Sequence, residues 1–395
     1  MGIRDAATIL ALNSGSSSLK FGLYRVSQAQ TDMLFSGEAE SIGDEKGDFH
    51  ARDAGGNTLL AEKTALPGPA EAIARIAGLL AHFKMPSPDA VGHRVVHGGP
   101  KLRQHCLIDG STLGQLEAAS AFAPLHTPAA LAVIRGAQRQ FPAIPHIACF
   151  DTAFHADLPD VARVLPLPKE LRAEGIQRYG FHGLSCESIL HQLADDLPER
   201  LIVAHLGNGA SVTAIRNGKS VDTSMGLTPT GGVIMGTRPG DLDPGILIYL
   251  MREKNLDAAD LEELLDHHSG LLGISNISSD IRTLHERAPV NADARLAIDM
   301  FCYSVRKQIA AMIAAMDGAD MIVFTGGIGE NDAAIRAQIC DGLSWLGIGV
   351  EASRNRIADN PIGNPSSRCS VRVLPSREDA EIARHSWELI ANGPA

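Results

Sequence analysis

Two segments of the chain share one pattern of apolar and polar positions. Each is an apolar run, then a loop of Gly, Ser and Asn, then a second apolar run; they read ILALNSGSSSLKFGLY from Ile9 and IVAHLGNGASVTAIRNG from Ile202. Placing Ile9 on Ile202 also places Ser18 on Ser211. A hairpin loop of small residues can turn its backbone N–H groups toward one point, which suits a phosphate. Two copies half a chain apart predict a duplicated protein of two lobes, with phosphates held in the cleft between them.

The spacing of apolar positions predicts a mixed series of strands and helices after each opening hairpin. The predicted strands cover 7–13, 18–26, 33–41, 91–96, 144–150, 201–206, 211–216, 219–224, 321–324 and 371–374. The predicted helices cover 67–84, 112–123, 128–141, 186–196, 244–253, 258–267, 279–287, 292–316 and 377–391. This order favours an α/β fold with two duplicated lobes, each a mixed sheet flanked by helices.

The domain boundary is predicted in an aperiodic stretch, 151–183, that is rich in Pro, Gly, His and Arg. Residues 1–151 with 379–395 form the predicted N-terminal lobe, and residues 152–378 form the C-terminal lobe. The last helix is expected to pack on the first lobe. The alternative is one doubly wound nucleotide-binding domain with an insertion, which predicts a single phosphate loop. The duplicated hairpin favours two lobes. The single-domain alternative also lacks its usual motifs, because no G-x-G-x-x-G motif follows the first strand and no Walker A motif occurs.

The charge balance excludes several classes of partner. The 395 residues carry a formal net charge of −11 and have no long run of Lys and Arg, so neither nucleic acid nor an anionic membrane is an expected partner. Aromatic residues make up 4%, too few for a surface that stacks single-stranded nucleic acid. The six cysteines form no CxxC motif and no apolar run reaches the length of a membrane span, which favours a cytoplasmic protein with reduced thiols.

Three Gly-rich segments are candidate phosphate or nucleotide sites. In the first loop, Lys20 offers a point charge to a phosphate, and Asn13 can reach Mg²⁺ directly or through water. The second segment, HLGNG at 205–209, has glycines for a tight turn and an amide donor. The third, TGGIGEN at 325–331, follows an apolar run and predicts an adenosine-binding turn at a helix start. Each segment also fits an ordinary polar turn, and the match between the first two is what favours phosphate binding.

Two arginines and a histidine add candidate chemistry. Arg94 lies inside an apolar strand, where its charge requires a partner, and Arg238 lies in a loop without apolar periodicity. A planar guanidinium can grip a carboxylate or a phosphoryl group with two hydrogen bonds. Asp151 and His182 lie at the two ends of the boundary stretch, and a histidine there can donate to a phosphoryl group in transfer. The histidine spacing in this region matches no zinc pattern.

Together these strings resemble the acetate/propionate kinase family. The motifs occur in the family's order from about Leu10 to Arg384: NSGSSSLK, GHRVVHGG, FDTAFH, RYGFHG, HLGNG, MGTRPGDLDPG, TGGIGEN and the acidic pair Glu378-Asp379. The family belongs to the actin/Hsp70/sugar-kinase superfamily. The resemblance therefore implies two duplicated actin-like (ribonuclease H-like) lobes with the active site in the cleft between them. It also implies that the N-terminal lobe holds acyl substrate and metal, and that the C-terminal lobe binds nucleotide and forms a homodimer.

The resemblance also assigns roles to individual residues by motif. It implies Asp151, His182 and Arg238 as catalytic residues. The implied Mg²⁺ ligands are Asn13 and Glu378, with Mn²⁺ as an alternative ion. Acetate would bind Arg94 and place its methyl group in a small apolar pocket formed by Val96, Leu125, Phe181 and Pro229. The implied nucleotide contacts are Lys20, His205, Leu206, Gly207, Asn208, Gly209, Asp280, Ile281, Arg282, Gly327, Ile328, Gly329, Glu330 and Asn331. The sequence departs from the family at Gly231, where many members carry an acidic residue.

The implied reaction converts ATP and acetate into ADP and acetyl phosphate by direct in-line transfer. A carboxylate acceptor is already ionised near neutral pH, so Asp151 is expected to orient a guanidinium or a metal-bound water rather than to act as a base. The alternative within the family is a propionate or broad short-chain carboxylate kinase, because one methylene is worth only about 1–3 kcal/mol of discrimination. The opposing class, a non-catalytic actin-like ATP-binding module, has no need for Arg94, His182 and a methyl-sized pocket.

Overall fold

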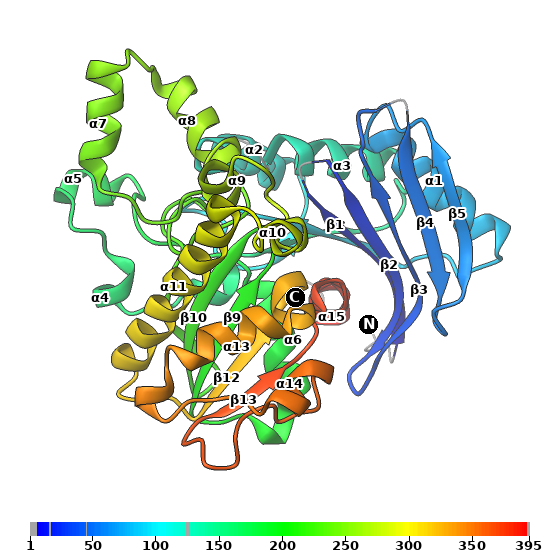
Figure 1. Cartoon of the computed structure of the whole chain (residues 1–395). Coiled ribbons are helices and arrows are strands. Elements are labelled where there is room, and N and C mark those ends of the chain that lie inside the picture. The colour runs from blue at the N-terminus through cyan, green and yellow to red at the C-terminus, as the bar shows by residue number, and fades with distance from the viewer. Residues whose placement is uncertain (1–5, 16, 45, 124–126, 393–395) are drawn as a thin grey trace. The chain divides into compact units, whose positions relative to one another are not determined.

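The chain forms two compact units of mixed α/β structure. The computed structural model describes residues 6–15, 17–44, 46–123 and 127–392 (Figure 1). Unit 1 comprises Met1–Ala156, Gly183–Ser188 and Arg377–Ala395, and unit 2 comprises Asp157–His182 and Ile189–Ser376. Relative to the predicted lobes, unit 1 gains 152–156, 183–188 and 377–378.

Unit 1 is built on a sheet of eight described strands in the order β5-β4-β3-β2-β1-β6-β8-β7. The strands β1 to β5 pair antiparallel in succession, whereas β6 lies parallel to both β1 and β8. The strands are β1 (Ala6–Ser14), β2 (Leu19–Ser27), β3 (Thr31–Glu40), β4 (Gly47–Asp53), β5 (Thr58–Thr64), β6 (Ala90–Val95), β7 (Cys106–Leu107) and β8 (His146–Phe150). The helices of this unit are α1 (Pro69–His82), α2 (Gly110–Ala118), α3 (Thr127–Gln140) and α15 (Glu378–Asn392), together with the first residues of α6 (Gly183–Leu193).

Different helices cover the two faces of this sheet. Leu10 and Leu12 of β1 belong to one apolar cluster, which includes Ile73 of α1. Ile9 lies in a second cluster with Ile382 of α15, so the predicted packing of the last helix on the first lobe is confirmed. Successive residues of a strand point to opposite faces, and burial of both faces explains the run of consecutive apolar residues from Ile9 to Leu12 in β1.

Unit 2 is built on a sheet of five described strands in the order β11-β10-β9-β12-β13. The strands are β9 (Arg200–Leu206), β10 (Ala210–Arg216), β11 (Lys219–Thr223), β12 (Met321–Thr325) and β13 (Ser370–Val373). The helices that lie wholly in this unit are α4 (Asp160–Arg163), α5 (Lys169–Ala173), α7 (Pro244–Glu253), α8 (Ala258–His267), α9 (Gly270–Ser275), α10 (Ile281–Arg287), α11 (Ala292–Ala315), α12 (Gly326–Asn331), α13 (Ala333–Asp341) and α14 (Ala352–Ile357). The long helix α11 packs on β9 and β10, and its buried residues include Phe301, Val305 and Ile309.

The two sheets repeat one topology. The run β3-β2-β1-β6-β8 in unit 1 corresponds to β11-β10-β9-β12-β13 in unit 2. In both runs the first three strands pair antiparallel and the last three lie parallel. The matching hairpins are β1–β2 and β9–β10, the two segments that the sequence pattern aligned. The predicted duplicated α/β fold is confirmed.

Several elements were not predicted. β4 and β5 extend the first sheet beyond the repeat, and β5 contains no buried residue, so its sequence has little apolar signal. The helices α9, α13 and α14 are six to nine residues long, too short for a clear helical period. The stretch 151–183 includes two short helices, α4 and α5, without a buried residue. None of the helices in the described part of the chain combines the length and apolar character that crossing a membrane requires.

Candidate functional site

The predicted site residues of unit 1 gather at one edge of its sheet. Asn13 is near the end of β1, Arg94 is near the end of β6, and Asp151 directly follows β8. Because β1, β6 and β8 are parallel neighbours, their carboxyl ends meet at the same edge, where ligands bind in open α/β sheets. The acidic pair Glu378 and Asp379 reaches this edge from the first turn of α15.

Arg94 and Asp151 form a buried ion pair. Nε and Nη2 of Arg94 both donate to Oδ2 of Asp151, at 2.9 and 2.6 Å. The Asp151 side chain is 0% exposed and the Arg94 side chain 17%. Nη1 of Arg94 donates to Oδ1 of Asn13 at 3.3 Å. These bonds use three of the five guanidinium N–H groups, which leaves two for a ligand. Oδ1 of Asp151 has no hydrogen-bond partner among the described residues.

The amide of Asn13 lies between two carboxylates. Its Nδ2 donates to Oε2 of Glu378 and to Oδ1 of Asp379, both at 3.0 Å. The predicted metal ligands Asn13 and Glu378 are therefore close together. The nitrogen of the amide, which cannot bind a cation, faces the acids, while its oxygen faces Arg94.

Three acidic groups surround the single guanidinium of Arg94. Burial raises the pKa of Asp379 to about 6, against the hydrogen bond from Asn13. Burial also raises the pKa of Asp151 to about 6, in opposition to the positive charge of Arg94 and together with the negative charge of Glu378. This surplus of negative charge, of which Asp151 is the buried part, suits a cation at the same edge of the sheet.

Lys20 lies beside this acidic group, on β2. It lines a cavity of about 280 Å³ together with His50, Arg52 and Asp379. The cavity opens on the strands β2, β3 and β4, where Lys20 pairs with Glu38 in the antiparallel register. The position of Lys20 is compatible with its predicted contact to a phosphate.

In unit 2, His182 lies against the second Gly-rich loop. Its Nδ1 is 2.9 Å from Oγ of Ser211, and its ring stacks on His205 with 4.1 Å between the ring centroids. His182 has a left-handed backbone with φ 58°. A Cβ added at Gly209 would lie 3.3 Å from Nε2 of His182 and 2.9 Å from Nη2 of Arg238. A side chain at position 209 would therefore push the ends of the Arg238 and His182 side chains away from the loop.

Arg238 is anchored on its other side by a backbone carbonyl. Its Nη1 donates to the carbonyl oxygen of Pro229 at 2.6 Å. A Cβ at the divergent Gly231 would lie 3.3 Å from Oδ1 of Asp241, so a carboxylate already stands beside that position. Of the predicted methyl-pocket residues, Phe181 is buried in unit 2, Val96 is buried in unit 1, and Leu125 lies outside the described residues.

Two of the predicted nucleotide segments of unit 2, 205–209 and 327–331, are neighbours. Gly207 donates its N–H to the carbonyl of Gly209 at 3.0 Å, which closes the tight turn of 205–209. The N atom of Gly327 is 3.9 Å from the position of a Cβ at Gly207. A Cβ at Gly327 would meet no described atom within 4 Å, so this side of the turn is open. Leu206 and Gly329 are buried beneath the two turns.

The remaining predicted nucleotide segment, 280–282, makes contacts within itself. The carboxylate of Asp280 accepts the backbone N–H of Arg282 and caps α10. The Arg282 guanidinium returns to the same carboxylate at 2.9 Å, with 86% of its side chain exposed. Ile281 is buried. The nucleotide role of these residues stays a prediction.

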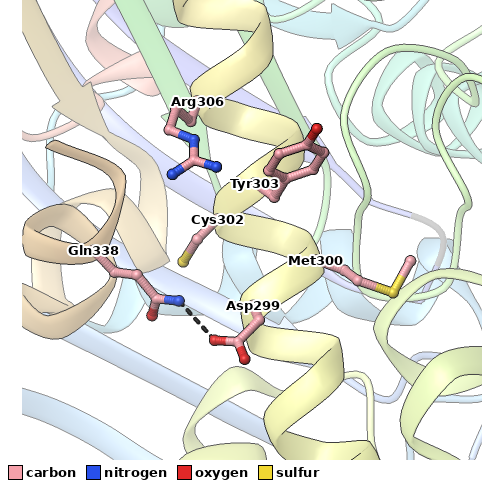
Figure 2. Close-up of a pocket in the computed structure, with 6 residues that line it drawn as sticks. All are labelled: Asp299, Met300, Cys302, Tyr303, Arg306 and Gln338. Atoms are coloured by element: carbon pink, nitrogen blue, oxygen red, sulfur yellow. Dashed lines mark hydrogen bonds between the residues drawn. The ribbon is translucent and has the colours of Figure 1, made fainter. Parts of the chain in front are cut away.

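One cavity of unit 2 contains none of the predicted site residues. It measures about 360 Å³ and lies between α11 and α13 (Figure 2). Its lining residues are Asp299, Met300, Cys302, Tyr303, Arg306 and Gln338. Gln338 donates to Asp299, and Arg306 lies over the ring of Tyr303. Its lining residues include none of the residues predicted for phosphoryl transfer, so the cavity is separate from the candidate site.

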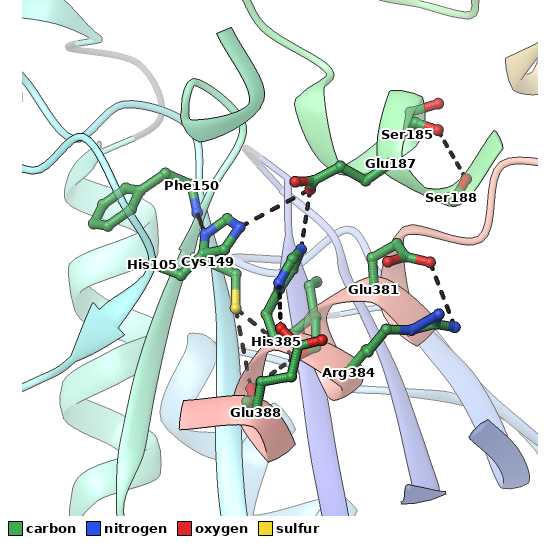
Figure 3. A network of polar contacts seen from close by, with 12 residues as sticks. His105, Cys149, Phe150, Ser185, Glu187, Ser188, Glu381, Arg384, His385 and Glu388 are labelled. Carbon is green, nitrogen blue, oxygen red and sulfur yellow. Dashed lines mark hydrogen bonds and ion pairs between the residues drawn. The ribbon is translucent and has the colours of Figure 1, made fainter. Parts of the chain in front are cut away.

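A separate cluster in unit 1 has the composition of a metal site. His105, Glu187 and His385 place one ligand atom each within 4.8 Å of one another, and they are the one such group found in the described part of the chain (Figure 3). Nε2 of His385 lies 3.1 Å from Glu187, and its Nδ1 lies 3.5 Å from Glu388. No local pattern in the sequence indicates this cluster, because its members are far apart along the chain.

The protonation of the two histidines, rather than a bound metal, explains the contacts of this cluster. The backbone N–H of Phe150 donates to Nδ1 of His105 at 3.0 Å, so the proton of neutral His105 lies on Nε2. A histidine that binds a metal instead donates through its other nitrogen. Burial, with the nearby charge of His385, lowers the pKa of His105 to about 3. Burial alone would lower the pKa of His385, but hydrogen bonds to Glu187 and Glu388 raise it to about 10.

Replacing His385 with Gln is expected to destabilise the protein in a pH-dependent way. The pKa of His385 is raised from about 6.5 in an unfolded chain to about 10. Its stabilising contribution is therefore complete below pH 6.5 and is lost as the pH rises through 10. Breaking a buried ion pair lowers the free energy of unfolding by about 3 kcal/mol. The positive charge of His385 is not replaced by its neighbours, because His105 is neutral and Glu381 is acidic.

Chemical denaturation at pH 6.5 and pH 10 measures this effect as the difference between variant and parent. The control is His268→Gln, because His268 pairs with Glu263 at 3.0 Å but both side chains are 61% exposed. The control is expected to change stability by less than about 0.5 kcal/mol. An equal loss for His385→Gln at both pH values would contradict a charged His385.

Comparison with known proteins gives one consistent result. Residues 8–384 match the model of the acetokinase family. The chain is similar to an acetate kinase of Campylobacter lari, with 39% identity over 396 residues, covering 97% of this chain and 99% of that protein. It is similar to the crystal structure of a propionate kinase from Francisella tularensis, with 35% identity and a TM-score of 0.90. It is also similar to that of an acetate kinase from Porphyromonas gingivalis, with 35% identity and a TM-score of 0.84. Each structural match covers 97% of this chain and 100% of the other.

Proposed function

The chain belongs to the acetokinase family, and we propose that it transfers the terminal phosphoryl group of ATP to acetate, reversibly and in line. The observation that carries the proposal is the Arg94–Asp151 pair. Two N–H groups of Arg94 remain free of described partners in a partly exposed site at the edge of the sheet. A fork of that kind binds a carboxylate with two hydrogen bonds.

Asp151 is proposed to fix the guanidinium rather than to remove a proton. Acetate has no proton to lose near neutral pH, because carboxylic acids of this kind ionise well below it. Oδ2 of Asp151 accepts two hydrogen bonds from Arg94, which sets the plane of the guanidinium. This arrangement prepares the acceptor for in-line attack, and positioning of this kind is the main source of catalysis in phosphoryl transfer.

His182 and Arg238 are proposed to stabilise the phosphoryl group during transfer. Charge on that group spreads over its equatorial oxygens, and cationic donors fixed in advance lower the barrier. Both side chains lie next to Gly209, in the loop proposed to hold the phosphates. The contacts of His182 with Ser211 and His205 restrict the orientation of its ring.

The proposed nucleotide site comprises the turns 205–209 and 327–331 of unit 2, and Lys20 of unit 1 is proposed separately as a phosphate contact. ATP is the phosphoryl donor of acetate kinases, and the adjacency of the two Gly-rich turns supports a nucleotide on their open side. The segment 280–282 is proposed to contact the adenosine end.

A divalent cation, Mg²⁺ or Mn²⁺, is part of the proposal. The fit rests on the orphaned Oδ1 of Asp151 and on the surplus of carboxylates around Arg94. Glu378 and Asn13 are proposed to hold the ion, directly or through water, with Asp151 nearby. When bound, the ion offsets the negative charge of the phosphates.

The order of preference among acceptors is expected to be acetate, then propionate, then butyrate. One methylene changes discrimination by only about 1–3 kcal/mol, so kcat/KM should fall about 10- to 100-fold from acetate to propionate. The relatives include enzymes described as acetate kinases and one described as a propionate kinase. Comparing kcat/KM for acetate with kcat/KM for propionate therefore decides between the two activities. Steady-state kcat/KM for the three acids measures it. A higher value for propionate would assign the chain to the alternative, a propionate kinase.

A homodimer is also proposed, with α7 in the interface. This helix has no buried residue and exposes Ile246, Ile248, Tyr249 and Met251 by 40–56%. An exposed apolar patch of this kind is typical of an interaction surface. Sedimentation is expected to give a dimer for the parent and a monomer for Ile248→Glu. Val161→Glu is the control, because Val161 is 95% exposed without such neighbours on its helix. A dimer that survives Ile248→Glu would remove α7 from the interface.

A further inference from the structure

Arg336, on α13, is a buried cation whose hydrogen bonds all go to neutral groups. Its side chain is among the largest that are fully buried, with 1% exposure. Nε donates to Oδ1 of Asn355 at 2.8 Å, and Nη2 donates to the carbonyl of Asn355 at 2.6 Å. Nη1 donates to the carbonyls of Gly329 and Glu330, both at 2.9 Å. An arginine buried without a bonded carboxylate is costly, so packing alone does not explain it.

The carbonyls of Gly329 and Glu330 belong to α12, the helical turn of the third Gly-rich segment. α12 is six residues long and ends at Asn331, so its last carbonyls have no partner within the helix. Negative partial charge collects on such carbonyls, and a cation beside them is favourable. The planar fork of Arg336 binds both carbonyls at once and connects them to α14 through Asn355.

The carboxylate of Glu330 fixes the opposite end of the same turn. Its Oε1 accepts the N–H of Gly326 at 3.0 Å and the N–H of Ser376 at 2.8 Å. Gly326 has a φ of 77°, and a Cβ there would lie 2.8 Å from the carbonyl oxygen of Leu206. The turn is thus packed tightly against the end of β9, which leads into 205–209.

These contacts divide the turn into a fixed side and an open side. Arg336 and Glu330 act on the fixed side, whereas Gly327 faces open space. The resemblance places Glu330 among the nucleotide contacts, but Oε1 is already shared by two backbone N–H groups. A ligand on the open side would meet backbone atoms whose positions these two side chains determine.

We propose that Arg336 and Glu330 are positioning residues, which shape the 326–331 turn for the nucleotide without touching it. The inference rests on the proposed function only in naming the ligand, a nucleoside diphosphate or triphosphate. Loss of either residue loosens the turn and weakens nucleotide binding, and it leaves the carboxylate acceptor site of unit 1 unchanged.

Titration calorimetry with MgADP tests the proposal directly. Arg336→Lys keeps the charge but loses the fork, and Glu330→Ala loses the acceptor; each is expected to raise the Kd for ADP and the KM for ATP about 10-fold. The KM for acetate is expected to stay within twofold. Glu330→Gln keeps an oxygen acceptor and is expected to restore most of the affinity. Arg354→Lys is the control, because Arg354 lies on α14 and pairs with exposed Asp359 instead of the turn.

Hydrogen exchange of the 326–331 peptide provides the second measurement. Faster exchange in Arg336→Lys, with a melting temperature near that of the Arg354→Lys control, supports positioning. Unchanged ADP affinity in folded Arg336→Lys and Glu330→Ala would overturn it, as would equal increases in the KM for ATP and acetate. Weakened ADP binding by these variants supports the inference even if the parent forms no acetyl phosphate. A parent that binds no ADP overturns both the inference and the proposed function.

Discussion

Replacing Arg238 with alanine is expected to lower kcat by about 10³-fold or more, with little change in KM for ATP or acetate. The guanidinium is held by the Pro229 carbonyl through Nη1, and Nη2 lies against Gly209. This places a fixed cationic donor beside the loop proposed to hold the phosphates. A donor that strengthens its contacts as charge spreads over the phosphoryl oxygens lowers the barrier without tightening ground-state binding.

Steady-state kinetics in both substrates separates this role from simple binding. Arg238→Lys keeps the charge but loses the fork, and it is expected to recover only part of the lost rate. Arg356→Ala, at the exposed end of α14, is the control and is expected to leave kcat unchanged. A normal kcat with a raised KM in Arg238→Ala would mean that Arg238 binds substrate and transition state equally.

The second large effect is expected for Asp151→Asn, with a fall in kcat of about 10²- to 10³-fold. Asparagine has nearly the same shape, so the change removes the charge that pairs with Arg94 and leaves the volume of the site intact. The guanidinium then loses the carboxylate oxygen that accepts from both Nε and Nη2. The positive charge of Arg94 remains, so the KM for acetate is expected to rise much less than kcat falls.

A second Arg–Asp fork in the chain offers the control. Arg200 donates to Asp320 through Nε at 3.2 Å and Nη2 at 2.6 Å, in a partly exposed part of unit 2 without a predicted site residue. Asp320→Asn is expected to leave kcat unchanged. Near-normal kcat in Asp151→Asn would remove Asp151 from the mechanism, including the orienting role.

The fold could be predicted largely because its central strands are buried on both faces. Leu10 and Leu12 pack on one side of β1 and Ile9 on the other, so the centre of this strand and that of its repeat, β9, consist of consecutive apolar residues. The Gly-rich loops follow these strands directly, which let the sequence pair 13–20 with 205–209. β5 has no buried residue, and nothing in its pattern distinguishes it from a loop.

Individual residues of the candidate site can be proposed from the sequence, but the contacts between them cannot. The sequence pattern places Arg94 in an apolar strand, where its charge needs a partner. The structure identifies that partner as Asp151. The orientation of the Asn13 amide depends on Glu378 and Asp379 from the other end of the chain. The bond of Glu330 to Ser376 likewise joins positions that no local pattern connects.

The central claim, transfer of a phosphoryl group from ATP directly to acetate, is tested most directly by ³¹P NMR of the products. Purified protein with MgATP and acetate is expected to form acetyl phosphate and ADP in equal amounts. ATP is expected to stay intact when acetate is omitted, and acetyl phosphate with MgADP should regenerate ATP. Release of inorganic phosphate from ATP at the same rate with and without acetate, with no acetyl phosphate signal, would contradict the account.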